Sequence, residues 1–326
     1  MGSFNCSDGW FVHLIQRTLK FNEQMTGESK KRLTKFTIWL KALMLLSLIV
    51  GHSCKPVPKE KKEIQYKVGV VDLMILKRQK ISALPLAKEI GADGVEVDMG
   101  GLGNRPTFNN KLIDPVIRKQ YMDTARQLGI EISSLAMTGF YSQSLPKREG
   151  AVETIQDCIN TMVLMGVKVG FLPLGVEGDL IQYPERRAAI VERLKEVGKK
   201  AEAAGVVIGI ETALDAKGEV DLLNDIGSPA IQICFNFANP LKSGRDINEE
   251  LKILGKNRIC EIHATNKDSV WLENDPQIDM HQIKTTLDEL EWSGWLLVER
   301  SRDANSTRDV RGNFGANVAY LKSVFQ

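Results

Sequence analysis

The sequence of 326 residues predicts an α/β fold, a (βα)8 TIM barrel that forms a single domain from residue 64 to residue 326. Two observations lead to this prediction. Eight short apolar segments rich in Val and Ile alternate with longer segments of helical character, and this alternation is typical of a parallel sheet surrounded by helices. Eight is also the number of parallel strands that closes a barrel.

The expected strands are mostly too apolar to have one face in water, which is typical of buried parallel strands. The segment YKVGVVDLM is the first of them and GWLLVER is the last. In chain order the expected strands are residues 66–74, 94–100, 130–137, 167–174, 206–212, 231–239, 259–266 and 294–300.

The segments between the strands predict helices, most clearly at residues 115–128, 151–165, 184–204 and 280–291, with a last helix at 306–324. Asp279 is a suitable N-cap for the fourth of these helices. Glycine often occupies the left-handed position after a helix, and five glycines stand at expected joints between a helix and the next strand: Gly91, Gly129, Gly166, Gly205 and Gly294.

An open, doubly wound sheet is the alternative to the barrel. Such a sheet would need a glycine-rich phosphate-binding loop after its first strand, and the sequence has none there. The segment GGLGNRP (100–106) follows the second strand without matching GxGxxG, so we expect it to be a flexible loop of the barrel.

The charge distribution argues against a nucleic-acid-binding protein. The net charge of +2 comes from residues 1–53, which carry seven basic and three acidic residues; the remainder has 36 basic and 38 acidic residues. A nucleic-acid-binding domain usually has a clear basic excess. With 26% charged and 43% hydrophobic residues, the composition also excludes disordered, collagen-like and coiled-coil classes.

The N-terminal segment predicts export. Residues 30–35 are basic, residues 36–50 are largely apolar and small residues follow, which is the order of zones in a secretory signal. We expect residues 1–24 to be an over-extended start before an initiating Met25, residues 25–53 to be the signal peptide and residues 54–63 to be a tether. The apolar run is shorter than the roughly 20 residues of a membrane span, so an uncleaved anchor is the alternative.

The cysteines fall into separate groups. Cys54 resembles the lipid-attachment cysteine of bacterial lipoproteins, although Leu is usual where Gly51 stands. Membrane contact is therefore expected only through the signal or a lipid anchor, in a periplasmic or membrane-anchored protein. Cys158, Cys234 and Cys260 are expected to be buried free thiols, and without a CxxC motif a thiolate zinc site is not expected.

Polar residues gather where the last four expected strands end, which is where the functional groups of a barrel lie. Glu211 ends the fifth strand, Asn236 and Asn239 lie in the sixth, His263 in the seventh and Glu299 ends the eighth. Two carboxylates, an imidazole and an amide oxygen predict a divalent-metal site. A structural histidine and salt bridges at the rim are the alternatives.

These strand ends resemble those of the xylose-isomerase-like TIM-barrel superfamily of sugar isomerases and epimerases, over residues 64–326. GADGVEVD (91–98) is similar to its second strand, and GIET, EIHATNKD and VER are similar to its metal-binding strand ends. The resemblance implies one divalent ion (Mn²⁺, Mg²⁺, Co²⁺ or Zn²⁺) held by Glu211, Asn236, His263 and Glu299. The family usually has Asp at position 236, so we expect weaker metal binding, or an Asn236 that contacts substrate while water completes the coordination.

The resemblance also implies the reaction. A metal-bound sugar loses a proton next to its carbonyl group, and Glu211 and Glu299 are expected to move that proton. Phe140 and Tyr141 are expected in a lid over the site. The expected substrate contacts are Glu96, Asn239, Lys267 and Trp271.

Export favours a non-phosphorylated sugar as the small-molecule substrate, since sugar phosphates are mainly cytosolic. The same initial chemistry would also serve a keto-sugar glycoside lyase or hydrolase. A non-catalytic carbohydrate-binding lipoprotein is a further alternative, which Asn236 favours. An endonuclease IV-like activity would need several more histidines than the two that follow residue 53.

Overall fold

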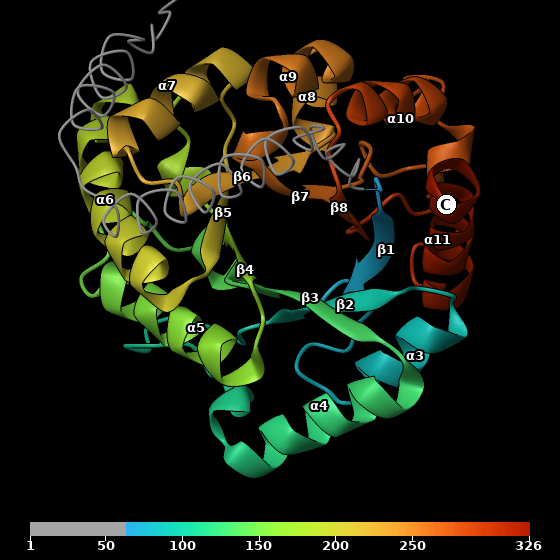
Figure 1. Ribbon diagram of the computed structural model, residues 1–326, viewed down its shortest axis with the longest axis horizontal. Coiled ribbons are helices and arrows are strands. Elements are labelled where there is room, and N and C mark those ends of the chain that lie inside the picture. Colours follow the sequence, from blue (N-terminus) through green and yellow to red (C-terminus); the bar gives the residue numbers. More distant parts are fainter. Residues whose placement is uncertain (1–62) are drawn as a thin grey trace, which may run out of the picture. The chain divides into compact units, whose positions relative to one another are not determined.

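The computed structural model describes residues 63–326, and in this part eight parallel strands form a closed barrel with helices around it (Figure 1). The predicted (βα)8 barrel is thereby confirmed. The expected start, signal peptide and tether fall on residues 1–62, outside the described residues. The strands are β1 (Tyr66–Val71), β2 (Gly94–Asp98), β3 (Glu131–Ala136), β4 (Val169–Pro173), β5 (Val207–Glu211), β6 (Ile231–Asn236), β7 (Ile259–His263) and β8 (Gly294–Val298).

Each strand pairs in parallel with the next one in the chain, and β8 closes the ring against β1. At the closure Tyr66 pairs with Gly294 and Val70 with Val298. The register shifts within the β2–β3 and β6–β7 pairs. The strand order is therefore the chain order, which brings the ends of β5, β6, β7 and β8 side by side.

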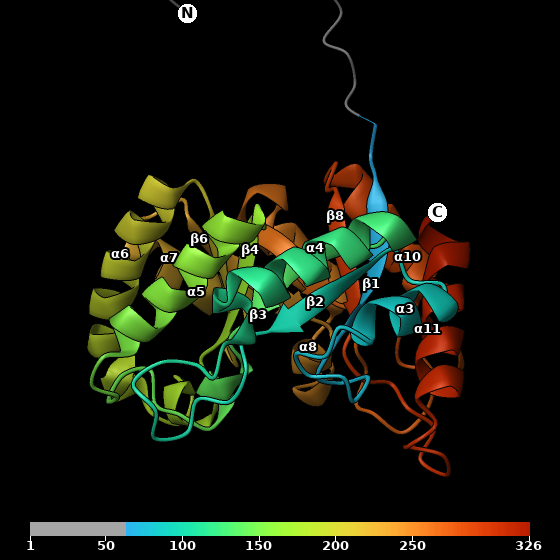
Figure 2. The ribbon, with the colours of Figure 1, turned by 90° about the horizontal axis from the view of Figure 1, so that it is seen from below.

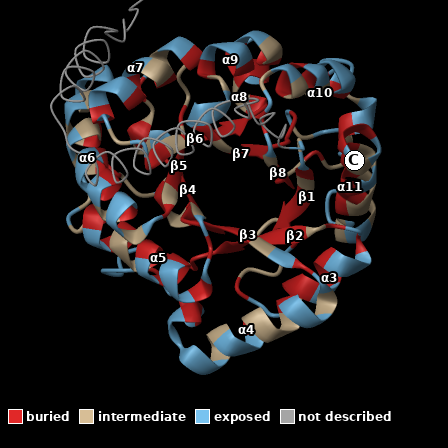
Figure 3. Cartoon of the chain, viewed as in Figure 1, coloured by how far each residue is buried: buried red, intermediate tan, exposed pale blue. Residues whose placement is uncertain are grey.

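Most helices lie outside the ring and cover the strands with apolar faces, while their outer faces are exposed (Figure 3). The helices α4 and α5 have the predicted bounds. The described α-helices are α3 (Ala83–Glu89), α4 (Pro115–Leu128), α5 (Ala151–Met165), α6 (Arg187–Ala204), α7 (Ala216–Ile226), α8 (Ala238–Lys242), α9 (Ile247–Leu254), α10 (Met280–Glu289) and α11 (Val310–Phe325).

Two predicted helix starts were wrong. The 3-10 helix η5 (Pro184–Arg186) precedes α6, which therefore begins at Arg187. The last helix begins at Val310 rather than at residue 306, because the Asp309 side chain accepts a hydrogen bond from the Gly312 backbone N–H and caps the helix there. The predicted capping of α10 by Asp279 is confirmed.

Gly294 was wrongly predicted as a helix-ending glycine. It begins β8, and Glu291 takes the positive φ of 53° after α10. A Cβ atom at position 294 would lie 2.6 Å from the Trp292 ring, so this glycine is required by packing. The other four predicted glycines do have positive φ, between 63° and 83°.

The predicted free thiols are confirmed, with Cys158 and Cys234 buried and Cys260 partly buried. Among the described helices, none is both long and apolar enough to cross a membrane. The loops that follow the strands gather with α8 on one side of the barrel, the lower side in Figure 2. This side carries the candidate site.

Candidate active site

A cavity opens where β5, β6, β7 and β8 end, with an empty volume of about 390 Å³ that includes open solvent. Its floor is formed by strand-end carboxylates and amides, and its rim by the following loops. The lining residues are Tyr141, Glu211, Asn236, Ala238, Lys242, Thr265, Asn266, Lys267, Asp268, Glu299 and Arg300.

Glu211, the last residue of β5, is held by two neighbours. The Tyr141 hydroxyl donates a hydrogen bond to its Oε2 at 3.1 Å, and Asn239 Nδ2 donates to its Oε1 at 3.3 Å. Burial, and next the negative charge of Glu299, raise the pKa of Glu211 above its ordinary value. Glu211 is therefore a carboxyl group that is held in place and that takes up a proton more readily than an exposed glutamate.

Asn236 has an amide orientation that its hydrogen bonds determine. The backbone N–H of Ala238 donates to the Asn236 side chain at 3.0 Å, so the atom facing it must be the oxygen. The amide nitrogen consequently faces Glu299 and donates to its Oε2 at 3.2 Å. In this arrangement Asn236 orients Glu299 and presents no oxygen toward Glu299.

His263, the last residue of β7, is buried between two carboxylates. Its Nδ1 lies 3.9 Å from Glu299 Oε2, its Nε2 lies 3.6 Å from Glu96 Oε1, and neither nitrogen has a hydrogen-bond partner. Burial alone would lower the pKa of His263, but the carboxylates of Glu96, Glu299 and Glu261 raise it to about 10. The ring therefore lies in a strongly negative environment.

Two of the four expected ligands lie at a separation that a divalent cation could bridge. The 3.9 Å between His263 Nδ1 and Glu299 Oε2 is too long for a hydrogen bond, and two metal–ligand bonds of about 2.1 Å can span it. Glu211 lines the same cavity as Glu299. Asn236 would have to turn its amide to become a ligand.

Glu96 lies beneath His263 and does not line the cavity, so its predicted contact with substrate does not match its position. The Ser134 hydroxyl donates to Glu96 Oε2 at 2.9 Å, while Glu96 Oε1 is unpartnered and faces His263. A carboxylate behind a ligating histidine typically fixes the orientation of the ring. Glu96 is in position for this role.

Glu261 is a buried residue of this inner layer that the sequence reasoning missed. Both of its carboxyl oxygens lack a hydrogen-bond partner, and burial, and next the negative charge of Glu96, raise its pKa to about 8. A carboxyl oxygen of Glu261, a ring nitrogen of His263 and the Sγ atom of Cys234 lie within 4.8 Å of one another, close enough to hold a metal ion together. The two-residue alternation along β7 places Glu261 on the same face as His263, and this signal was present in the sequence.

The other predicted contacts have different outcomes. Lys267 lines the cavity, whereas Asn239 lies behind it and holds Glu211 and the Thr212 carbonyl. Trp271 does not line the cavity; its Nε1 donates to Asn313 Oδ1 of α11 at 2.9 Å, which fixes it as a packing residue. Of the expected lid, Tyr141 lines the cavity.

Phe140 was wrongly expected in the lid. It is completely buried and contacts the ring of Phe108 edge-on, with the centroids 6.0 Å apart. Its apolar ring therefore stabilises the core under the loop after β3, while the neighbouring Tyr141 reaches the site.

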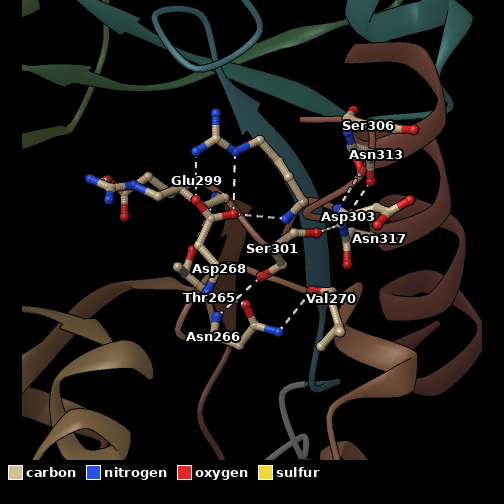
Figure 4. A network of polar contacts seen from close by, with 12 residues as sticks. Thr265, Asn266, Asp268, Val270, Glu299, Ser301, Asp303, Ser306, Asn313 and Asn317 are labelled. Carbon is tan, nitrogen blue, oxygen red and sulfur yellow. Dashed lines mark hydrogen bonds and ion pairs between the residues drawn. The ribbon is translucent and has the colours of Figure 1, made fainter. Parts of the chain in front are cut away.

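The loops after β7 and β8 are joined to each other and to α11 by side-chain and backbone hydrogen bonds (Figure 4). Asn266 N–H donates to Ser301 Oγ at 3.0 Å, and Asn317 Nδ2 of α11 donates to the Ser301 carbonyl at 2.7 Å. Asp268 accepts from the Arg302 backbone N–H and from its guanidinium group. These contacts hold the two loops in one arrangement at the rim.

Comparisons with known proteins agree with this architecture. The 2-epi-5-epi-valiolone 7-phosphate 2-epimerase of Actinoplanes sp. is 26% identical over 170 residues, which are 51% of this chain and only 60% of that protein. D-psicose 3-epimerase of Clostridium cellulolyticum H10 has a similar structure, with a TM-score of 0.62 and 13% identity over 80% of this chain and 99% of that chain. For 3-keto-D-glucoside 4-epimerase of E. coli the TM-score is 0.60, with 15% identity over 79% and 100% of the two chains.

At these identities the structural likenesses establish a common fold. The family model described as a xylose isomerase-like TIM barrel matches residues 84–324, which is most of the described barrel. The closed eight-stranded ring and the polar residues at its later strand ends agree with that match. The chain belongs to the xylose isomerase-like TIM-barrel family.

Proposed function

We propose that this protein is a divalent-metal-dependent sugar epimerase or isomerase that removes and returns a proton next to a carbonyl group. The single observation that carries the proposal is that Glu211 and Glu299 line one cavity, with Glu299 beside the unpartnered Nδ1 of buried His263. Two carboxylates beside an open cavity can act as proton acceptor and donor. The similar proteins named above are epimerases.

Glu211, His263 and Glu299 would hold the metal ion. When bound, the ion would supply positive charge that stabilises negative charge developing on the substrate oxygens. Glu211, whose pKa is raised in the metal-free protein, accepts the proton while Tyr141 and Asn239 hold its carboxylate in place. Glu299, oriented by Asn236, returns a proton to the neighbouring carbon or to the opposite face.

Export of the protein is part of the proposal, based on the signal-like residues 25–53 and on Cys54. A keto-glycoside lyase would begin with the same proton abstraction and then expel its aglycone. The reaction product therefore distinguishes these activities.

The test is product analysis by NMR. The protein is incubated with Mn²⁺ or Mg²⁺ and with a panel of ketoses, aldoses and keto-glycosides, in parallel with a chelator-treated sample. We expect chelator-sensitive formation of an epimer or an isomer. A released aglycone would identify a lyase, and chelator-insensitive sugar binding without any product would contradict the proposal in favour of a carbohydrate-binding protein.

A further inference from the structure

Three cationic side chains line the cavity above the carboxylates. Lys242 ends α8, Lys267 follows β7 and Arg300 follows β8. Within residues 63–326, neither lysine forms an ion pair or a side-chain hydrogen bond. The guanidinium Nη2 of Arg300 is 3.6 Å from Glu299 Oε1, which is beyond hydrogen-bond distance.

Three carboxylates also line the cavity, but they have other partners or are expected to bind the metal ion. These carboxylates are Glu211, Asp268 and Glu299. Burial opposes ionisation of Asp268, but its hydrogen bonds with Arg302 outweigh burial and lower its pKa. Asp268 and Arg302 therefore neutralise each other.

Of the remaining charges, Glu211 and Glu299 would be neutralised by the divalent ion of the proposed centre. Among the described residues, Lys242 and Lys267 are then left without a protein counter-charge, and Arg300 is left beside a Glu299 whose charge the metal ion would share. Uncompensated cations around a cavity attract anionic ligands and increase their rate of association. The charge balance thus indicates the charge of the substrate.

The rim backbone is fixed. The Arg300 N–H donates to Thr265 Oγ1 at 3.3 Å, and Asp268 N–H donates to Asn266 Oδ1 at 2.8 Å. The two loops also share the Asn266–Ser301 bond and the Asp268–Arg302 pair (Figure 4). Lys267 and Arg300 consequently extend from ordered backbone, which lowers the entropic cost of binding an anion between them.

We propose that the substrate of this cavity is an anionic sugar whose phosphate or carboxylate group is bound by Lys242, Lys267 and Arg300. Its carbonyl end lies at Glu211 and Glu299. This inference rests on the proposed function and adds the class of substrate to it. A phosphate group would overturn the expectation of a non-phosphorylated sugar, whereas a carboxylate group would agree with it.

The test compares three probes that differ in one group: D-fructose, D-fructose 6-phosphate and D-fructuronate. Binding to the metal-loaded protein is measured by calorimetry, and turnover by NMR, at low salt and at 0.3 M NaCl. We expect at least about tenfold tighter binding of one anionic probe than of D-fructose, corresponding to about 1.4 kcal/mol. The anionic probe that binds more tightly shows whether the cavity prefers phosphate or carboxylate. Raising the salt concentration should weaken binding of that probe and leave binding of neutral D-fructose unchanged.

The variants Lys242→Met and Lys267→Met should each weaken binding of the anionic probe by about threefold to fivefold, which is the usual range for exposed charge pairs. The double variant should weaken binding of the anionic probe by at least about tenfold, and by clearly more than it weakens binding of D-fructose. Lys195→Met, at an exposed position on the outer helix α6, is the matched control and should change neither.

Equal binding of neutral and anionic probes, or equal binding by the double variant and the wild type, would overturn the inference. Because binding is measured separately from turnover, a protein that prefers anionic sugars without converting any of them would contradict the proposed function alone. Turnover of neutral sugars with no anion preference would contradict this inference alone.

Discussion

The two halves of the barrel mouth use acidic strand-end residues in opposite ways. After β1 and β2, Asp72 accepts backbone hydrogen bonds from Gln79 and Asp98, and Asp98 is held by Arg78 and Thr138. After β5 and β8 the carboxylates instead line an open cavity. An acidic residue at a strand end therefore indicates a site only where its carboxylate also lines an open cavity.

The largest effect is expected in the half formed by β5 to β8. Glu211→Gln cannot accept a proton, so we expect it to lower the rate of proton exchange by about 10³-fold. Its thermal stability should be unchanged or higher, because a buried carboxyl group with a raised pKa is replaced by a neutral amide. Glu219→Gln is the matched control, since Glu219 is also buried with a raised pKa but lies outside the cavity; its rate should stay within about threefold of wild type.

A second change, in the other half, should affect stability instead of activity. Asp98→Asn leaves Arg78 without its ion pair, although it also relieves the burial that raises the pKa of Asp98, and we expect a net loss of about 1 kcal/mol in the free energy of unfolding, measured in urea. Asp123→Asn, in an exposed ion pair of α4, should leave the urea midpoint nearly unchanged. If Asp98→Asn instead abolished proton exchange at full stability, the comparison of the two halves would be wrong.

A third substitution tests the orientation of Asn236. In Asn236→Asp one carboxylate oxygen can still cap Ala238, but the other faces Glu299 Oε2 where an amide N–H donated a hydrogen bond. Two adjacent carboxylates favour a bound cation, so we expect about tenfold tighter Mn²⁺ binding by calorimetry and lower stability without metal. Unchanged metal affinity would show that position 236 lies outside the influence of the metal centre.

The smallest expected effect is a pH dependence of stability that comes from Glu219, a buried residue outside the cavity. Burial is the main reason that the pKa of Glu219 rises from its ordinary 4.5 to about 8, while the Thr212 hydroxyl donates to its Oε1. Between those two pH values the folded protein binds more protons at this group than the unfolded chain, so stability must fall as the pH rises. From pH 6 to pH 7 wild type should lose about 1 kcal/mol relative to Glu219→Gln. If the free energy of unfolding, measured in urea, changed equally in the two proteins between pH 6 and pH 7, the raised pKa of Glu219 would be contradicted.

The sequence predicted the strands and several helices well because their signals are local. The Asp114 cap and Gly129 bound α4 at the predicted residues. The start of α11 was misplaced because Ser306 and Asp309 are both suitable caps, and the choice depends on the tertiary position of the loop after β8. Gly294 was misassigned because glycine is needed there to leave room for the Trp292 ring, a contact that a helix-ending pattern does not reveal.

The candidate site was predicted less completely. Strand ends brought Glu211, Asn236, His263 and Glu299 together as expected. The depth of Glu96 and the direction of Trp271 depend on neighbours across the barrel, which no local pattern contains. Lys242 was missed because the short helix α8, which places it in the cavity, has too few residues to give a periodic signal.

We expect Glu211 and Glu299 to move a carbon-bound proton in a metal-dependent site. The most direct measurement is the incorporation of solvent deuterium into substrate carbon, followed by NMR in D₂O with Mg²⁺, after chelation and after metal is restored. We expect exchange at the carbon next to the carbonyl group that disappears with chelator, returns with metal and is absent in Glu211→Gln. Exchange that persists in the chelated protein, or that Glu211→Gln catalyses at the wild-type rate, would contradict this expectation.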